Sequence, residues 1–465
     1  MTFKQILLFT THLGACGLVV VGCATQSIQT QPESNFGSTS SHAGELPARE
    51  VHALALPEQP SLTDYLRYAA LNNPGLEAAF YQWKVALEKV PQARALPDPR
   101  FNYAYFVEQV ETRVGPQRQR FGISQTFPWF GKLRLRGSKS GEAAIAAQME
   151  YEQRKLKLYA EVKDAYFELG YLRRAIDLTE ENIELIKHLE SAAQARFRTG
   201  SDVTGVVKAQ VELGKLEDKL RALQELRDPL NARLNAALNR DSTAPVAWPS
   251  EPDPTRVALD EAVMVEQIIA ANPELSALDA KVRESELGVK LARKKFFPDL
   301  TLGIDYVETQ DARLSGVAGS GKDPIMIMGS VQMPLWLGKH KAGLREAEAR
   351  LSAANKQREE REGLLLADLK MALYRYHDAE RKISLFGDTL DPLARNSLDV
   401  AEQAYRSGRA DFLELIDAQR LLLDVQLSYH RSIADREQQL AQIERMVGAS
   451  FEELLGPAEK GDSRL

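Results

Sequence analysis

The strongest constraint on the fold is an internal repeat, because the 465-residue chain carries the same series of short motifs twice. Each motif of the first half returns in the second half, in the same order and about 200 residues later. The recurring pairs are Asn73-Pro74-Gly75-Leu76 with Asn272-Pro273-Glu274-Leu275, Pro97-Asp98 with Pro298-Asp299, Phe127-Pro128-Trp129-Phe130-Gly131-Lys132 with Met333-Pro334-Leu335-Trp336-Leu337-Gly338-Lys339, Arg198-Thr199-Gly200 with Arg406-Ser407-Gly408, and Ala209-Gln210 with Ala418-Gln419. The sequence therefore predicts two tandem copies of one structural unit, over residues 61–250 and 251–450, followed by a tail at 451–465.

Long proline-free stretches predict long helices in each half. Proline is absent between Pro128 and Pro229 and again between Pro334 and Pro392, and it costs about 3 kcal/mol inside a helix. The leucines of residues 213–234 follow the alternating three- and four-residue spacing of a coiled-coil seam. Gly200 and Gly408 each separate two such runs, where a tight turn requires a permissive backbone. Each half is thus predicted to contain a long helical hairpin that turns at its glycine.

Four short segments alternate apolar and polar residues with a period of two. The apolar positions are Phe101, Tyr103, Tyr105 and Val107, then Phe121, Ile123 and Phe127, then Leu300, Leu302, Ile304 and Tyr306, then Ile325, Ile327, Val331 and Met333. About ten tilted residues are enough to cross a bilayer, so each half is predicted to supply two membrane-spanning strands. We expect polar loops at 110–117 and 310–323, and a soluble two-sided sheet is the alternative.

Four strands cannot form a closed membrane barrel, because such barrels begin at about eight strands. An open strand edge is not tolerated in lipid, where every backbone polar group must find a partner. If the strands are embedded, several copies must therefore pool them around a rotation axis. The sequence predicts a homo-oligomer.

The N-terminus has the features of a bacterial export signal. The apolar stretch Ile6–Val21 is followed by Gly22-Cys23, which resembles the lipobox in which the cysteine is acylated and becomes the first mature residue. Cys16 is a second candidate, and an ordinary signal peptide or an uncleaved anchor is the alternative. The residues after Cys23 are polar and rich in Ser, Thr and Gln, so they cannot bury enough apolar surface to fold. We predict a signal peptide at 1–22 and a lipidated Cys23 with a polar tether at 23–60.

The composition excludes several classes of function. The chain has 59 Lys and Arg against 65 Asp and Glu, for a net charge of −6, which argues against nucleic acid as a partner. Cysteine occurs only at Cys16 and Cys23, so the body of the chain has no disulfide framework, cysteine zinc site or thiol nucleophile. The seven histidines are scattered and no catalytic grouping is evident. We expect no enzymatic activity, no cofactor and no resident metal, although Met326 and Met328 share a strand face on which a soft cation could make contact.

Taken together, these motifs resemble those of the TolC-type outer-membrane efflux proteins, and the lipobox resembles their lipoprotein branch. The resemblance spans residues 60–449 and is carried by the Phe-Pro-Trp-Phe-Gly-Lys and Asn-Pro-x-Leu repeats and by Tyr405-Arg406-Ser407-Gly408. It implies a mainly α-helical trimer that shares a twelve-stranded outer-membrane barrel and extends a helical tube into the periplasm. It also implies a passive exit duct that docks to a periplasmic adaptor and an inner-membrane pump. Residues 110–130 look like those of members that serve heavy-metal efflux.

The resemblance also assigns candidate functional residues to the hairpin tips. Glu414 and Asp417 are three residues apart, hence on one side of a helix, and they match positions where TolC-like channels carry carboxylates around the closed periplasmic entrance. Arg409, Asp411 and Asp202 lie on the same tips and could make the bonds that hold the entrance closed. The alternative is that all of these are solvated surface charges.

Two other classes of protein remain open from the sequence. A periplasmic adaptor can also be a lipoprotein with a coiled-coil hairpin, but it carries one hairpin flanked by small all-β domains. A lipid-anchored enzyme or structural protein would need a catalytic set or a binding motif, and we find neither. The cargo cannot be read from the residues.

Overall fold

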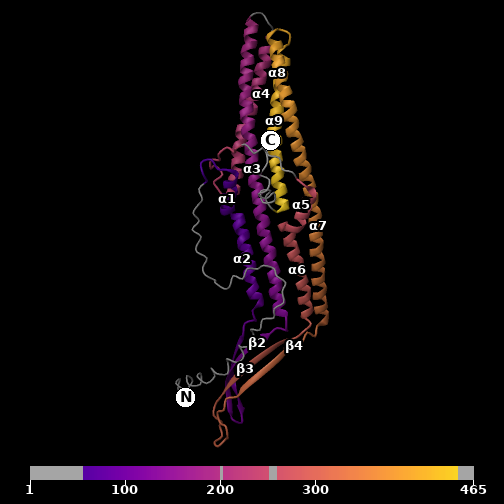
Figure 1. Ribbon diagram of the computed structural model, residues 1–465. Coiled ribbons are helices and arrows are strands. Elements are labelled where there is room, and N and C mark those ends of the chain that lie inside the picture. The colour runs from indigo at the N-terminus through magenta and orange to yellow at the C-terminus, as the bar shows by residue number, and fades with distance from the viewer. Residues whose placement is uncertain (1–55, 199–202, 251–258, 449–465) are drawn as a thin grey trace, which may run out of the picture. The chain divides into compact units, whose positions relative to one another are not determined.

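The computed structural model describes residues 56–198, 203–250 and 259–448, which belong to one compact unit that begins at Ala55. The first half contains α1 (Leu62–Asn72), α2 (Pro74–Arg94), β1 (Arg100–Thr112), β2 (Gly115–Phe127), α3 (Lys132–Arg198) and α4 (Thr204–Leu238). The second half contains α5 (Glu261–Ala271), α6 (Pro273–Lys294), β3 (Asp299–Thr309), β4 (Ile325–Gln332), α7 (Leu337–Ser384), the π-helix η2 (Leu385–Leu390), α8 (Asp391–Arg406) and α9 (Phe412–Val447) (Figure 1). The same order of helices and strands occurs twice, which confirms the mainly helical fold with two tandem repeats.

The Asn-Pro motif begins the second helix of each repeat and also ties that helix to the end of the repeat. The Asn73 side chain accepts a hydrogen bond at 3.0 Å from the backbone N–H three residues on, and donates one at 2.9 Å to the carbonyl of Ala237 in α4. Asn272 makes the equivalent pair of bonds, the second to the carbonyl of Met446 in α9 at 2.7 Å. In both helices proline follows at the first position, where its missing N–H costs nothing.

The strands form one antiparallel sheet in the order β1-β2-β3-β4. The long loop between β3 and β4 is confirmed, but the loop expected at 110–117 is wrong, because β1 runs to Thr112 and β2 starts at Gly115. Only Arg113 and Val114 connect the two strands. Gly115 permits this tight turn, since it adopts a φ of 133° and a Cβ there would lie 1.7 Å from the carbonyl oxygen of Gln310.

The two faces of the sheet differ as the alternation predicts. One row across the four strands consists of Phe101, Ile123, Ile304 and Ile327, all more than half exposed. The neighbouring row on the opposite face consists of Asn102, Gly122, Asp305 and Met326. The sheet therefore has one apolar face, one polar face, and two edges, β1 and β4, without a neighbouring strand among the described residues.

The helices next to the strands follow the strand order. α2 packs on α3, α3 on α6, and α6 on α7, as expected from their direct connections to β1, β2, β3 and β4. Beyond this layer, α3 also packs on α4 and α9, around an apolar core that includes Ile186, Leu216 and Leu415. None of the helices in the described part of the chain has the length and hydropathy of a membrane-spanning helix.

The long helix of the second repeat is interrupted, unlike its counterpart α3, which runs for 67 residues. After α7 the chain passes through the six-residue π-helix η2 and continues as α8, with Pro392 in the first turn of α8. A π-helix holds more residues per turn than an α-helix and is rare outside functional or strained segments. Near η2, Phe386, Leu390, Ala394 and Leu398 pack against α9 residues, and they are spaced four residues apart rather than alternately three and four.

Candidate functional site: the sheet, the strand–helix junction and the helical tips

The polar face of the sheet carries its charged groups. Arg120 of β2 pairs with Asp305 of β3, whose side chain is 2% exposed. Nη2 of Arg120 also lies 3.6 Å from the Sδ atom of Met328. Met326 and Met328 are both on this face, and each residue is 40% exposed. Within the described ranges, no three His, Cys, Asp or Glu residues come together as a metal site.

A compact contact joins the repeats where strands become helices, and we call Trp129, Lys132, Phe297 and Asp299 the strand–helix junction. Lys132 Nζ donates to Asp299 Oδ1 at 2.7 Å and to the carbonyl of Phe297 at 2.9 Å. The backbone N–H of Trp129 donates to the same carboxylate oxygen at 2.8 Å, and its ring stacks on Phe297 with centroids 5.5 Å apart. Only 7% of the Lys132 side chain is exposed. The end of β2 is thereby fixed against the start of β3.

The turn between α8 and α9 contains Gly408 with a φ of 76°. Asp411 caps α9, because its Oδ1 accepts hydrogen bonds from the backbone N–H groups of Leu413 and Glu414 at 2.7 and 2.9 Å. Arg409 Nε donates to the Ser407 hydroxyl at 3.0 Å. Among the described residues of one chain, the side chains of Arg409 and Asp411 therefore bond to residues two or three positions away in the sequence.

Glu414 and Asp417 are both exposed on the first turns of α9, while Leu415 and Ile416 between them are buried. The two carboxylates share an exposed stripe of α9 with Leu421. Three of the other predicted residues, Gly200, Asp202 and Cys23, lie outside the described residues.

An ion pair that the sequence did not predict links α4 to α9 just behind this stripe. Arg420 Nε donates to Glu212 Oε1 at 2.9 Å, a second guanidinium nitrogen contacts Oε2, and Nη1 contacts Asp417 at 3.3 Å. Glu212 is almost fully buried. Hydrogen bonding from Arg420 outweighs this burial and holds the pKa of Glu212 below its ordinary value of 4.5. The sequence relates the two residues in one way: Glu212 follows Ala209-Gln210, and Arg420 follows the second copy of this pair, Ala418-Gln419.

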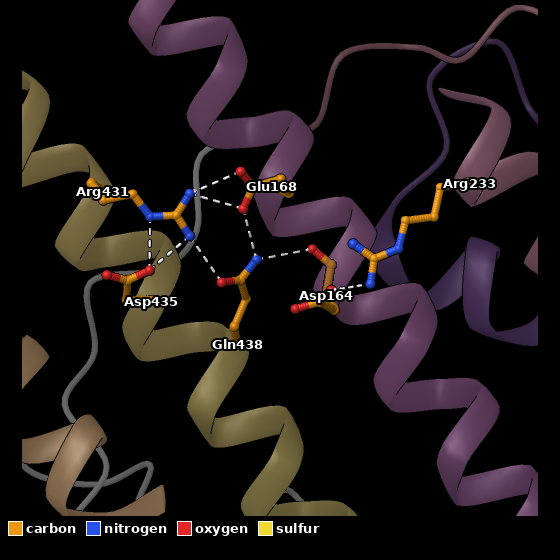
Figure 2. A network of polar contacts seen from close by, with 6 residues as sticks. All are labelled: Asp164, Glu168, Arg233, Arg431, Asp435 and Gln438. Carbon is orange, nitrogen blue, oxygen red and sulfur yellow. Dashed lines mark hydrogen bonds and ion pairs between the residues drawn. The ribbon is translucent and has the colours of Figure 1, made fainter. Parts of the chain in front are cut away.

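A second polar network crosses the core further along α9. Figure 2 shows its six members, Asp164, Glu168, Arg233, Arg431, Asp435 and Gln438. Arg431 of α9 donates to both carboxylate oxygens of Glu168 in α3 at 2.9 and 2.8 Å, and to Asp435 at 2.7 Å (Figure 2). Burial opposes the charge on Arg431, but these hydrogen bonds outweigh it and raise the pKa of Arg431 above its ordinary value.

The same network reaches α4. Gln438 donates to the carbonyl of Asp164 and to Glu168, and the Asp164 carboxylate accepts from Arg233 at 2.6 Å. The network therefore connects three helices and both repeats with charge-assisted hydrogen bonds, which are stronger than neutral ones. Each of its six members is hydrogen-bonded to another member, so the network holds α3, α4 and α9 in register.

Comparison with known families gives the identity of this architecture. The model of the outer membrane efflux protein family matches residues 66–240 and 264–449, one segment in each repeat. The chain belongs to this family. As an outer membrane efflux protein, it is located in the outer membrane and acts in export, and the adaptor alternative is thereby set aside.

Two curated relatives of this efflux protein illustrate the similarity. SilC of Salmonella typhimurium, a probable outer membrane lipoprotein, is 22% identical over 67% of this chain and 68% of its own length. CzcC of Cupriavidus metallidurans, a cobalt-zinc-cadmium resistance protein, is 22% identical over 82% of this chain and 88% of its own length. Among solved structures, that of CusC, a protein that forms a transmembrane channel, has a TM-score of 0.73 at 17% identity and covers 84% of this chain and 93% of its own. The likeness to CusC supports the fold.

Proposed function

We propose that three copies of this efflux protein form a passive exit duct with a shared twelve-stranded barrel, which receives cargo from a periplasmic adaptor and an inner-membrane pump. The observation that carries the proposal is the four-stranded sheet, which combines an exposed apolar face with two edges that pair with no other strand in the described part of the chain. Such a sheet is stable in lipid only when neighbouring copies pair with β1 and β4. The duct has no catalytic activity of its own in this proposal, and Cys23 carries a lipid anchor, as the lipoprotein name of SilC suggests.

We also propose that Glu414 and Asp417 surround the periplasmic entrance. Their exposure on one side of α9 supports this role, since rotational symmetry would turn each into a ring of carboxylates. Repeated like charges in a narrow opening attract cations and disfavour anions.

Metal cations fit this proposal as cargo. The relative CzcC is named a cobalt-zinc-cadmium resistance protein, and this name points to divalent metal ions. The acidic stripe on α9 would favour such ions at the entrance, and Met326 and Met328 would offer soft contacts at the sheet.

Single-channel recording of the purified full-length protein in a planar bilayer tests the proposal. We expect a cation-preferring conductance that multivalent cations block from the periplasmic side. The double variant Glu414→Gln, Asp417→Asn should lower the cation preference and weaken the block, and high salt should reduce the difference because exposed charges are screened beyond about 10 Å at 0.1 M. No conductance from the wild type would contradict the duct, and unchanged selectivity in the double variant at low salt would contradict the entrance assignment alone.

A further inference from the structure

The strand–helix junction is built from one motif of each repeat, but each motif occurs twice in the chain. Lys132 follows β2 and Asp299 precedes β3, and β2 and β3 are neighbours in the sheet. The second copies of these motifs place Lys339 after β4 and Asp98 before β1. Lys339 and Asp98 therefore lie at the two opposite edges of the sheet.

The second copy of the lysine motif keeps the spacing of the first but not its whole backbone conformation, because Gly131 has a φ of 84° before α3 begins, whereas Gly338 lies within α7. Trp336 precedes Lys339 by three residues, as Trp129 precedes Lys132, and in both cases the lysine N–H donates to the tryptophan carbonyl at 3.0 Å. The one extra residue of the second motif, Leu335, lies before the tryptophan and leaves this spacing unchanged.

The second copy of the junction lacks its partners within one chain. Asp98 and Lys339 are exposed, and neither forms an ion pair among the described residues. Trp336 is 80% exposed, whereas Trp129 is half-buried against Phe297. Leu96, which stands two residues before Asp98 as Phe297 stands before Asp299, is 46% exposed.

We infer that Lys339 of one copy pairs with Asp98 of the next copy, and that Trp336 packs on Leu96 of that copy. The inference rests on the proposed assembly, in which β4 of one copy pairs with β1 of the next. At that seam, the residues after β4 and before β1 meet as those after β2 and before β3 meet within the chain. The site is complete only when two copies meet.

This pair also explains why the sheet edges join in one order. Between copies inserted in the same direction, a β1–β1 contact would bring two Asp98 carboxylates together, and a β4–β4 contact would bring two Lys339 ammonium groups together. Like charges that face each other penalise wrong partners, whereas the β4–β1 contact brings opposite charges together. Only this head-to-tail contact repeats around an axis and closes a ring.

Thiol cross-linking of full-length protein in membranes tests the inference. Asp98 and Lys339 are both replaced by Cys, and the protein is treated with a short bifunctional thiol reagent and separated under denaturing conditions. We expect covalent dimers and trimers from the double variant, none from either single variant, and dimers when the two single variants are expressed together. The matched control, Lys132→Cys with Asp299→Cys, should cross-link within one chain and form no covalent multimer.

Charge reversal provides a second test that needs no cysteine. Asp98→Lys or Lys339→Asp alone should lower the temperature at which the oligomer dissociates, and the two changes together should restore it. Oligomers that stay intact without cross-linking in the Cys pair, or single variants that cross-link among themselves, would overturn the inference and leave the duct standing. Absence of any oligomer and of any conductance in the wild type would overturn the proposed function as well.

Discussion

Arg420 connects the two helical hairpins through a carboxylate that the fold has buried. Because Glu212 is almost fully buried, removing its partner leaves an unpaired charge, which costs more than the bond itself contributes. We expect Arg420→Met to destabilise the contact between α4 and α9 by about 1.5–3 kcal/mol. Hydrogen exchange of the α9 amides should detect this as faster exchange in the first turns. Asp417→Asn, which removes only an exposed contact, is the control and should change exchange little.

The pKa of Glu212 sets the pH range of this effect. A carboxylate whose pKa is lowered by folding contributes stability above its ordinary pKa, and this contribution is lost as the pH falls through the folded value. The stabilisation by Glu212 and Arg420 is therefore complete at neutral pH and declines below 4.5. The difference in exchange between wild type and Arg420→Met should shrink in that acidic range. A difference that persists unchanged well below it would assign the effect to lost packing of the arginine.

The strands show how strongly position within an element determines the effect of a charge. Ile327 lies on the apolar face and is 83% exposed, whereas Ser330 lies on the polar face. Arginine on a lipid-facing strand position costs about 2–4 kcal/mol near the bilayer midplane but little in the lumen. We expect Ile327→Arg to block membrane assembly and Ser330→Arg to assemble with an altered conductance. Heat-modifiable migration and single-channel recording measure the two outcomes, and equal tolerance of both variants would mean that the assignment of the faces, or the barrel itself, is wrong.

Elements whose signals are local could be predicted from the sequence, and those that depend on distant contacts could not. The alternation of Phe101 and its neighbours is encoded within a few residues, so the strands could be predicted. The Asn73 and Asn272 caps are equally local, although the sequence showed them only as a repeated motif. The turn after Thr112 was predicted too long, because polar residues of β1 and β2 look like a loop until the sheet pairs them. The Glu212 contact joins residues 208 positions apart, and no local pattern marks it.

At the scale of the whole molecule, two devices hold the chain in the membrane independently in our proposal. The strands assemble by pairing, and the lipid on Cys23 anchors the tether. We expect Cys23→Ser to yield an uncleaved precursor that takes up no radiolabelled palmitate and still forms heat-modifiable oligomers. Cys16→Ser is the control and should label normally. Labelling that survives in Cys23→Ser but disappears in Cys16→Ser would move the anchor to Cys16.

The π-helix η2 restricts how the length of this chain can change during evolution. Its extra residue lets Phe386, Leu390 and Ala394 all reach α9, although they are spaced four residues apart. A deletion within 385–390 would restore a regular helix but would turn every later position of α8 by about 100°, since 3.6 residues make one turn. Ala394 and Tyr405, now buried, would then rotate away from α9. Single-residue insertions and deletions in this segment are therefore disfavoured, whatever the residue added or removed.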